Sequence, residues 1–155
     1  MTRSLLYIDT SALAKWYLNE SCSEVVESLV QDEGSVATCG LTSVEMRCLL
    51  ARRRRNREID HAIEMRVLAA FEEDAQRGFL VQLAFAEPLF AAASRLIASL
   101  PDVPLRTLDA LHLAIMREHN LARLATADTV MAQAAAQLGI ETRLIREEHE
   151  SQRGP

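Results

Sequence analysis

The stretch LLYIDTSAL, residues 5–13, decides the fold of this chain and supplies the first residue of a candidate site. It opens with apolar residues that do not alternate with polar ones, which is typical of a β-strand buried on both faces. Asp9 follows directly, and a helical pattern begins after it, with Leu13, Trp16 and Tyr17 at helix spacing. A strand that passes into a helix through an acidic residue indicates an α/β protein, in which ligands bind at the carboxyl ends of strands.

Strands and helices alternate along the remainder of the chain. The sequence predicts strands over residues 5–8, 35–39, 79–85, 121–125 and 141–145. It predicts helices that begin near residues 10, 23, 42, 59, 88, 107 and 128. Because the strands alternate with helices, we expect a mainly parallel sheet covered by helices on both faces, which is a three-layer α/β/α sandwich. A chain of 155 residues is most simply one domain, so we assign residues 1–146 to it and the polar residues 147–155 to a flexible tail.

The composition is that of a soluble protein with enough apolar residues for a core. Hydrophobic residues make up 49% of the chain and charged residues 25%. The formal net charge of -5 argues against a broadly basic nucleic-acid-binding protein, although it allows a local basic patch. Cys22, Cys39 and Cys48 form no C-x-x-C pair, and we interpret them as reduced thiols of a cytoplasmic protein. No apolar stretch approaches the roughly 20 residues of a membrane span, so we expect no membrane partner.

Four acidic residues stand where a predicted strand ends or a predicted helix begins: Asp9, Glu45, Asp109 and Asp128. In a parallel sheet the carboxyl ends of the strands share one edge, so we expect the four carboxylates to lie close together. Clustered carboxylates repel one another unless a cation neutralises them. Oxygen ligands without histidine or cysteine suit Mg²⁺ or Mn²⁺ better than Zn²⁺. The pattern therefore predicts a site for a divalent metal ion, of the kind that can hydrolyse phosphodiesters.

Helix capping is the alternative explanation for the same acids. Asp9 and Asp128 could be helix N-caps, worth ~1 kcal/mol each, and Glu45 could complete a capping box with Thr42. Asp109 could stabilise its helix through the helix dipole, by roughly 0.3–1 kcal/mol. On this alternative the protein is a non-catalytic module that binds RNA or another protein.

Four segments carry a resemblance to a known family: YIDTSAL at 7–13, TSVE at 42–45, LDALHLA at 108–114 and TAD at 126–128. In order and spacing they resemble the signatures of PIN-domain nucleases, most closely those of the VapC-type toxins of bacterial type II toxin–antitoxin pairs. The resemblance covers nearly the whole chain. It implies an α/β/α sandwich and an endoribonuclease that hydrolyses RNA phosphodiester bonds with Mg²⁺ or Mn²⁺.

The resemblance also implies roles for particular side chains. It assigns catalytic and metal-binding roles to the four acids, and Asp9 and Asp109 are the favoured direct ligands. Thr126 resembles the small hydroxyl residue that the family carries two positions before the last acid. We expect Thr126 and Ser11 to lie beside the acids and to orient them.

The partners implied by the resemblance are an RNA substrate and a cognate VapB-like antitoxin, with a homodimer or a higher assembly in the complex. Trp16 and Tyr17 could form a docking surface for an antitoxin segment, or they could be the large members of a core poor in aromatic residues. Met65, Leu68 and Leu80 could belong to a dimer interface, although a place in the core is the default.

A run of four arginines, residues 52–55, lies at the end of a predicted helix. Arg52, Arg53 and Arg55 are candidates for contacts with RNA phosphates. The alternative is a solvated helix end, since cations are favourable at a helix C-terminus. Consecutive residues of a helix also point in different directions, so not all of these arginines can face one RNA.

His112 lies three residues after Asp109, on the same face of a predicted helix. One interpretation is a general base beside the metal site. Its apolar neighbours Leu111, Leu113 and Ala114 favour the other interpretation, a packed helix residue.

Two other α/β classes that gather acids at strand ends do not fit this chain. A phosphoacceptor receiver domain needs adjacent acids after the first strand and a late lysine, whereas the only lysine here is Lys15. A phosphatase with a D-x-D-x-T motif is disfavoured because residue 11 is serine.

Overall fold

A two-residue strand, β1 (Tyr7–Ile8), lies at the centre of a five-stranded sheet in the computed structural model, which describes residues 4–147. The strand order is β3-β2-β1-β4-β5. The other strands are β2 (Val36–Cys39), β3 (Leu80–Leu83), β4 (Arg123–Thr126) and β5 (Glu141–Leu144). All four pairs of neighbouring strands are parallel. The parallel sheet expected from the sequence is therefore confirmed.

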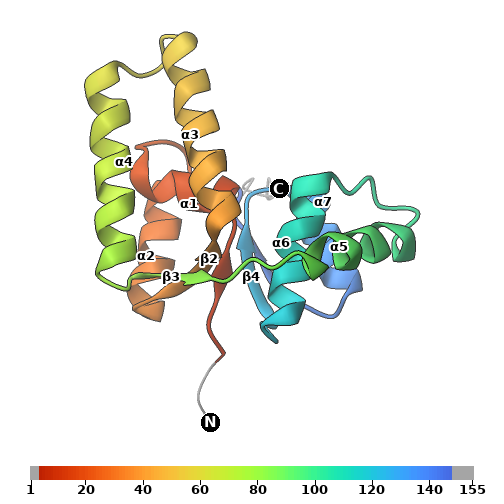
Figure 1. Cartoon of the computed structure of the whole chain (residues 1–155). Helices are drawn as coiled ribbons and strands as arrows, with labels where there is room; N and C mark the ends of the chain where they lie inside the picture. The colour runs from red at the N-terminus through yellow and green to blue at the C-terminus, as the bar shows by residue number, and fades with distance from the viewer. Residues whose placement is uncertain (1–3, 148–155) are drawn as a thin grey trace, which may run out of the picture.

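Seven helices of the described residues cover the two faces of this sheet (Figure 1). On one face lie α1 (Thr10–Tyr17), α2 (Ser23–Glu33), α3 (Gly40–Arg55) and α4 (His61–Gln76). On the other lie α5 (Pro88–Ser99), α6 (Thr107–Glu118) and α7 (Thr129–Gln137). α3 and α4 form an antiparallel pair that extends well beyond the sheet (Figure 1). The three-layer α/β/α sandwich is thus confirmed.

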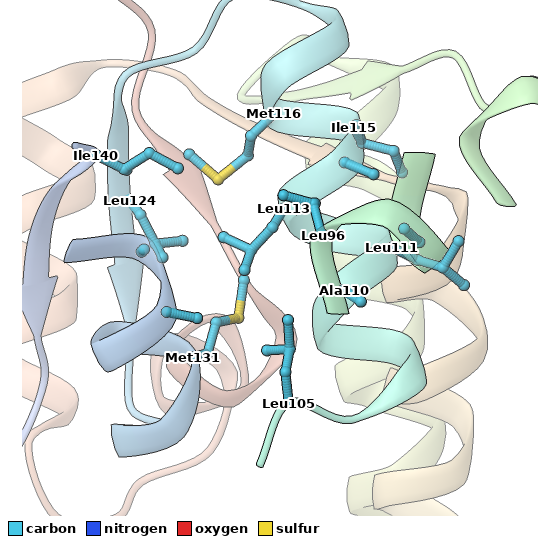
Figure 2. Close-up of a cluster of buried hydrophobic side chains, with 14 of the residues drawn as sticks. Leu96, Leu105, Ala110, Leu111, Leu113, Ile115, Met116, Leu124, Met131 and Ile140 are labelled. Atoms are coloured by element: carbon cyan, nitrogen blue, oxygen red, sulfur yellow. The ribbon is translucent and has the colours of Figure 1, made fainter. Parts of the chain in front are cut away.

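The core between the sheet and α5–α7 includes Leu113 of α6 and Met131 of α7 (Figure 2). α6 is the most deeply buried helix of this layer, since every residue over 109–116 is buried. A helix that is buried all round is normally apolar. Its two buried polar side chains, Asp109 and His112, therefore require partners.

The core between the sheet and α1–α4 contains residues whose place was ambiguous from the sequence. Trp16 and Tyr17 are partly buried and pack against this core. Leu68 and Leu80 are buried within it, whereas Met65 is 49% exposed. A place in the core is therefore confirmed for Leu68 and Leu80 only.

The carboxyl ends of β1 and β4 form the point at which the connections of the sheet diverge. After β1 the chain passes through α1 and α2 to β2, on one side, and after β4 it passes through α7 to β5, on the other. Open α/β sheets bind ligands in the crevice at such a point. Asp9 follows β1 directly, and its N–H donates to the carbonyl of Ala125 in β4 at 3.1 Å. Asp128 follows β4 after one intervening residue. Both acids thus reach the crevice.

The capping box of Thr42 and Glu45, which was the alternative explanation for Glu45, does not form. α3 begins at Gly40, with Cys39 as its N-cap residue. Thr42 consequently lies inside the first turn, where its buried hydroxyl accepts a hydrogen bond from Thr38 at 2.6 Å. Glu45 is left one turn further along the helix, where it meets other partners.

The described residues end shortly after β5. Of the tail expected at 147–155, only Glu147 falls among them, and its carboxylate accepts a hydrogen bond from the hydroxyl of Ser21 at 2.5 Å. The other residues of that expectation lie outside the described part of the chain. Over residues 4–147 no helix has the length and apolar character needed to cross a bilayer.

Candidate active site

Asp9 occupies the middle of the carboxyl edge of the sheet and is only 4% exposed. Its Oδ1 accepts a hydrogen bond from the N–H of Ala12 at 3.1 Å, so the side chain is the N-cap of α1. The hydroxyl of Ser11 donates to the same oxygen at 2.8 Å, and the hydroxyl of Thr126 donates to Oδ2 at 2.7 Å. The two hydroxyl residues expected beside the acids therefore contact Asp9 directly.

Burial is the strongest influence on the pKa of Asp9, because it disfavours the charged form. The hydrogen bonds to the carboxylate and the charge of His112 lower the pKa and offset only part of this effect. The result is a pKa raised to about 6. Ionised Asp9 is therefore unfavourable in this position unless a cation lies close to it.

Asp109 and Asp128 lie together at the same edge, where a guanidinium links them. Arg106 donates to Asp109 from Nε at 3.1 Å and to Asp128 from Nη2 at 2.7 Å. Asp128 is also the N-cap of α7, since its Oδ1 accepts from the N–H of Met131 at 2.9 Å. Burial raises the pKa of Asp109 and the charge of Asp128 raises it further, against the lowering effect of Arg106. The two carboxylates are thus close enough to share one cation.

Glu45 reaches the site from α3 and is held by side chains of two other elements. Its Oε1 accepts a hydrogen bond from the hydroxyl of Thr10 at 3.0 Å and lies 2.5 Å from Nε2 of His112. His112 is buried, as its apolar neighbours indicated, and its Nδ1 lies 2.5 Å from the hydroxyl of Tyr7. Burial lowers the pKa of His112, but the hydrogen bonds to Cys39 and Glu45 more than reverse this and raise it well above its usual value. A protonated His112 adds one positive charge to the cluster of acids.

The chemistry of these donors fits a hard divalent cation, although the acids do not converge on one point. Among the side chains of residues 4–147, no three of His, Cys, Asp or Glu come close enough to hold one ion. Between Asp109 and Asp128 the cation is the guanidinium of Arg106, whose side chain is 72% exposed and can leave without disturbing the core. The side-chain atoms of the acids, Ser11 and Thr126 that could bind an ion are carboxylate and hydroxyl oxygens, which Mg²⁺ and Mn²⁺ prefer. An ion could be held by Asp9 and Asp109 once Arg106 has moved.

A hollow beside the acids brings basic residues of α3 to the site. Its polar lining includes Thr10, Ser11, Glu45, Arg52, Arg55 and Arg106. Arg53 instead pairs with Glu20 at 2.6 Å and with Glu58 at 3.4 Å. The arginine run therefore contributes two of its three candidate RNA contacts to the hollow, because successive helix residues point in different directions.

A family model described as PIN domain matches residues 6–137, which include all four acids. The chain belongs to the PIN-domain family. Among curated proteins, none matches the chain. PIN domains are in general nucleases that hydrolyse nucleic acids, and they typically use divalent metal ions.

Three residues of the site were not predicted from the sequence: Thr10 and Arg106, which contact the acids of this PIN domain, and Tyr7, which contacts His112. Two of them carried a usable signal. Thr10 is the neighbour of Asp9, and Arg106 is three residues from Asp109, which is the spacing of neighbours on a helix. Tyr7 carried none, because its partner His112 is 105 residues away in the chain.

Replacement of Asp9 by asparagine is expected to stabilise the PIN domain at neutral pH. The pKa of Asp9 is raised from 3.8 to about 6 on folding, so the folded state binds this proton more tightly than the unfolded state. The stability supplied by the proton is complete below pH 3.8 and is lost as the pH rises through about 6. Asparagine stays neutral at every pH. The free energy of unfolding of Asp9→Asn, relative to that of the wild type, should therefore rise by about 2 kcal/mol from about pH 4.5 to about pH 7.5.

Urea denaturation in EDTA at the two pH values measures this gain. Asp60→Asn is the matched control, because Asp60 caps α4 in the same way, accepting from the N–H of Ile63 at 2.8 Å, but is exposed. The control should show no comparable rise. A difference between Asp9→Asn and the wild type that is the same at both pH values would contradict the raised pKa.

Proposed function

We propose that this PIN domain is a metal-dependent endoribonuclease and the toxin of a toxin–antitoxin pair. The observation that carries the proposal is that four carboxylates from four separate segments lie along the carboxyl edge of the sheet, where Thr126, Arg106 and His112 bind them. Membership of the PIN-domain family supports hydrolysis of nucleic acid as the reaction. The VapC-like segments at 7–13, 42–45, 108–114 and 126–128 support the narrower assignment to RNA, to a VapB-like antitoxin and to a cytoplasmic protein.

The proposed mechanism gives each acid a task. Bound by Asp9 and Asp109, Mg²⁺ or Mn²⁺ would lower the pKa of a bound water and neutralise charge on the attacked phosphate. The hydroxyls of Ser11 and Thr126 keep the carboxylate of Asp9 in one orientation. Glu45 or Asp128 would orient that water or hold a second, weaker ion; at present Asp128 and Asp109 both accept hydrogen bonds from Arg106.

The hollow supplies a binding site for the RNA strand. Arg52 and Arg55 line it within reach of Glu45, so a phosphate group next to the one under attack would meet a positive charge. Arg106 also lines the hollow and, once displaced from the carboxylates, would contribute a third positive charge. RNA would therefore be held along α3, with the scissile phosphate at the acids.

The proposed assembly is a homodimer or a larger complex with the antitoxin. Trp16 and Tyr17 are packed against the core but only partly buried, so they offer some apolar surface to an antitoxin segment. Met65, on the outer part of the α3–α4 pair, is exposed and available to a second copy of the chain.

Loss of either favoured metal ligand is expected to abolish cleavage. Asp9→Asn and Asp109→Asn should lower the rate of RNA hydrolysis on the order of 100-fold or more, because each removes a charge that holds the ion. The assay uses purified protein with total RNA in Mg²⁺ or Mn²⁺, and EDTA should have the same effect as the substitutions. Asp60→Asn should cleave at the wild-type rate. Full activity in EDTA, or in both active-site variants, would refute the proposal.

The second candidate function is a non-catalytic binding module of the same fold. It is favoured by one observation, namely that Asp9 and Asp128 do cap α1 and α7. Thermal unfolding separates the two candidates. An ion at 100 times its dissociation constant stabilises the folded state by about 2.7 kcal/mol, so Mn²⁺ should raise the Tm of the wild type and leave that of Asp9→Asn unchanged. Caps without a metal site would leave both unchanged.

The hollow predicts which arginines contact RNA. In an Asp9→Asn background, which prevents cleavage, Arg52→Ala and Arg55→Ala should each weaken RNA binding and lower the slope of log K against log salt by about 1. Arg53→Ala is the matched neighbour, and its slope should not change because Glu20 and Glu58 already pair its charge. The assignment fails if Arg53→Ala has the largest effect of the three.

A further inference from the structure

Among residues 4–147, hydrogen bonds reach only one oxygen of the Glu45 carboxylate. Thr10 and His112 both contact Oε1, at 3.0 and 2.5 Å. Within the described residues Oε2 has no hydrogen-bond partner. The side chain is 23% exposed and lines the hollow. Glu45 therefore has one oxygen that is fixed by the protein and one that is available to an ion or a water.

His112 is fixed from behind by a second buried side chain. Its Nδ1 lies 2.5 Å from the hydroxyl of Tyr7, and the two rings meet edge to face with centroids 5.8 Å apart. The hydroxyl of Tyr7 in turn contacts Sγ of Cys39 at 3.1 Å. All three side chains are buried, so the ring of His112 has little freedom to turn.

The donor of the hydrogen bond between His112 and Glu45 follows from the chemistry of the two groups. An ionised carboxylate only accepts hydrogen bonds, so Nε2 of His112 must be the donor. Tyr7, Cys39 and His112 thus form a buried polar chain inside an otherwise apolar core, which ends at Glu45. Such a chain is unfavourable for packing alone, since a leucine at position 112 would need no partners. The buried chain is explained by its effect on Glu45, the partly exposed residue at which it ends.

We propose that His112, held in place by Tyr7, is the positioning residue for Glu45. The bond to Oε1 sets the direction of the carboxylate and presents Oε2 to the ion or to the attacking water. This inference rests on the proposed ribonuclease function, and it goes beyond it by adding two buried residues that do not touch the substrate. Residues that orient metal ligands in this way typically change metal affinity or activity by about 10–100-fold.

The test compares variants that differ in what position 112 can donate. His112→Leu removes the donor and should weaken Mn²⁺ binding and lower kcat by about 10–100-fold, while KM for RNA stays the same because the arginines of the hollow are intact. His112→Gln keeps an N–H donor and should recover most of the loss. Tyr7→Phe deletes only the hydroxyl and should give a smaller loss of the same kind. Mn²⁺ affinity is measured by titration calorimetry on the full chain.

His119→Leu is the matched control, since His119 lies at the end of the same helix and bonds the carbonyl of Ala84 at 3.2 Å, outside the site. It should bind Mn²⁺ like the wild type. Folded His112→Leu with wild-type affinity and kcat would overturn the proposal. If His112→Leu does not fold, Tyr7→Phe decides in its place, and a wild-type result for that variant is equally fatal.

Failure of the proposed function is distinguishable from failure of this inference. A wild type that neither binds Mn²⁺ nor cleaves RNA would end the ribonuclease proposal. The positioning of Glu45 would then be decided by ¹⁵N NMR of the imidazole. The Nε2–H resonance of His112 should be present and should shift in Glu45→Gln. An unprotonated Nε2, or a resonance that does not move, would overturn the inference.

Discussion

The whole site follows from the place of β1 between β2 and β4. β1 has only two residues, yet it pairs on both sides and is completely buried. Because the connections after β1 and after β4 leave in opposite directions, the ends of these two strands lie at the crevice where open α/β sheets bind ligands. The backbone of Asp9 is fixed there by its hydrogen bond to Ala125 of β4, in addition to the contacts of its side chain. The other acids lie along the same edge, Glu45 on α3, Asp109 on α6 and Asp128 at the start of α7.

The four carboxylates at this edge are stabilised by three different sets of partners. Asp9 relies on hydroxyls and a helix N-terminus, Asp109 and Asp128 rely on Arg106, and Glu45 relies on His112. These arrangements differ in how easily they come apart. Thr126, which bonds Asp9, and Thr10 and His112, which bond Glu45, are buried, whereas the side chain of Arg106 is 72% exposed and is the partner most easily displaced. Capping and metal binding are therefore compatible uses of the same carboxylates, since a cap occupies only one oxygen.

The layout of the fold and the positions of the acids were predictable because they depend on local patterns. Apolar runs predicted the buried strands, and the ends of parallel strands must share an edge. The capping box at Thr42 failed because the helix begins earlier and the hydroxyl is bonded to Thr38. The arginine run was predictable as a basic helix end, but which arginines face the site depends on the rotation of α3. That rotation is set by packing against α1 and α4, which no short segment of sequence reveals.

Tyr7 illustrates a consequence of building chemistry into so short a central strand. Its backbone joins β2 to β4, its ring fills the interior, and its hydroxyl links Cys39 to His112 in the polar chain that leads to Glu45. Tyr7 therefore contributes both to the sheet and to the position of His112. A substitution that repacks this strand would also move the hydroxyl that holds His112, so the stability of the sheet and the orientation of His112 are coupled at this position.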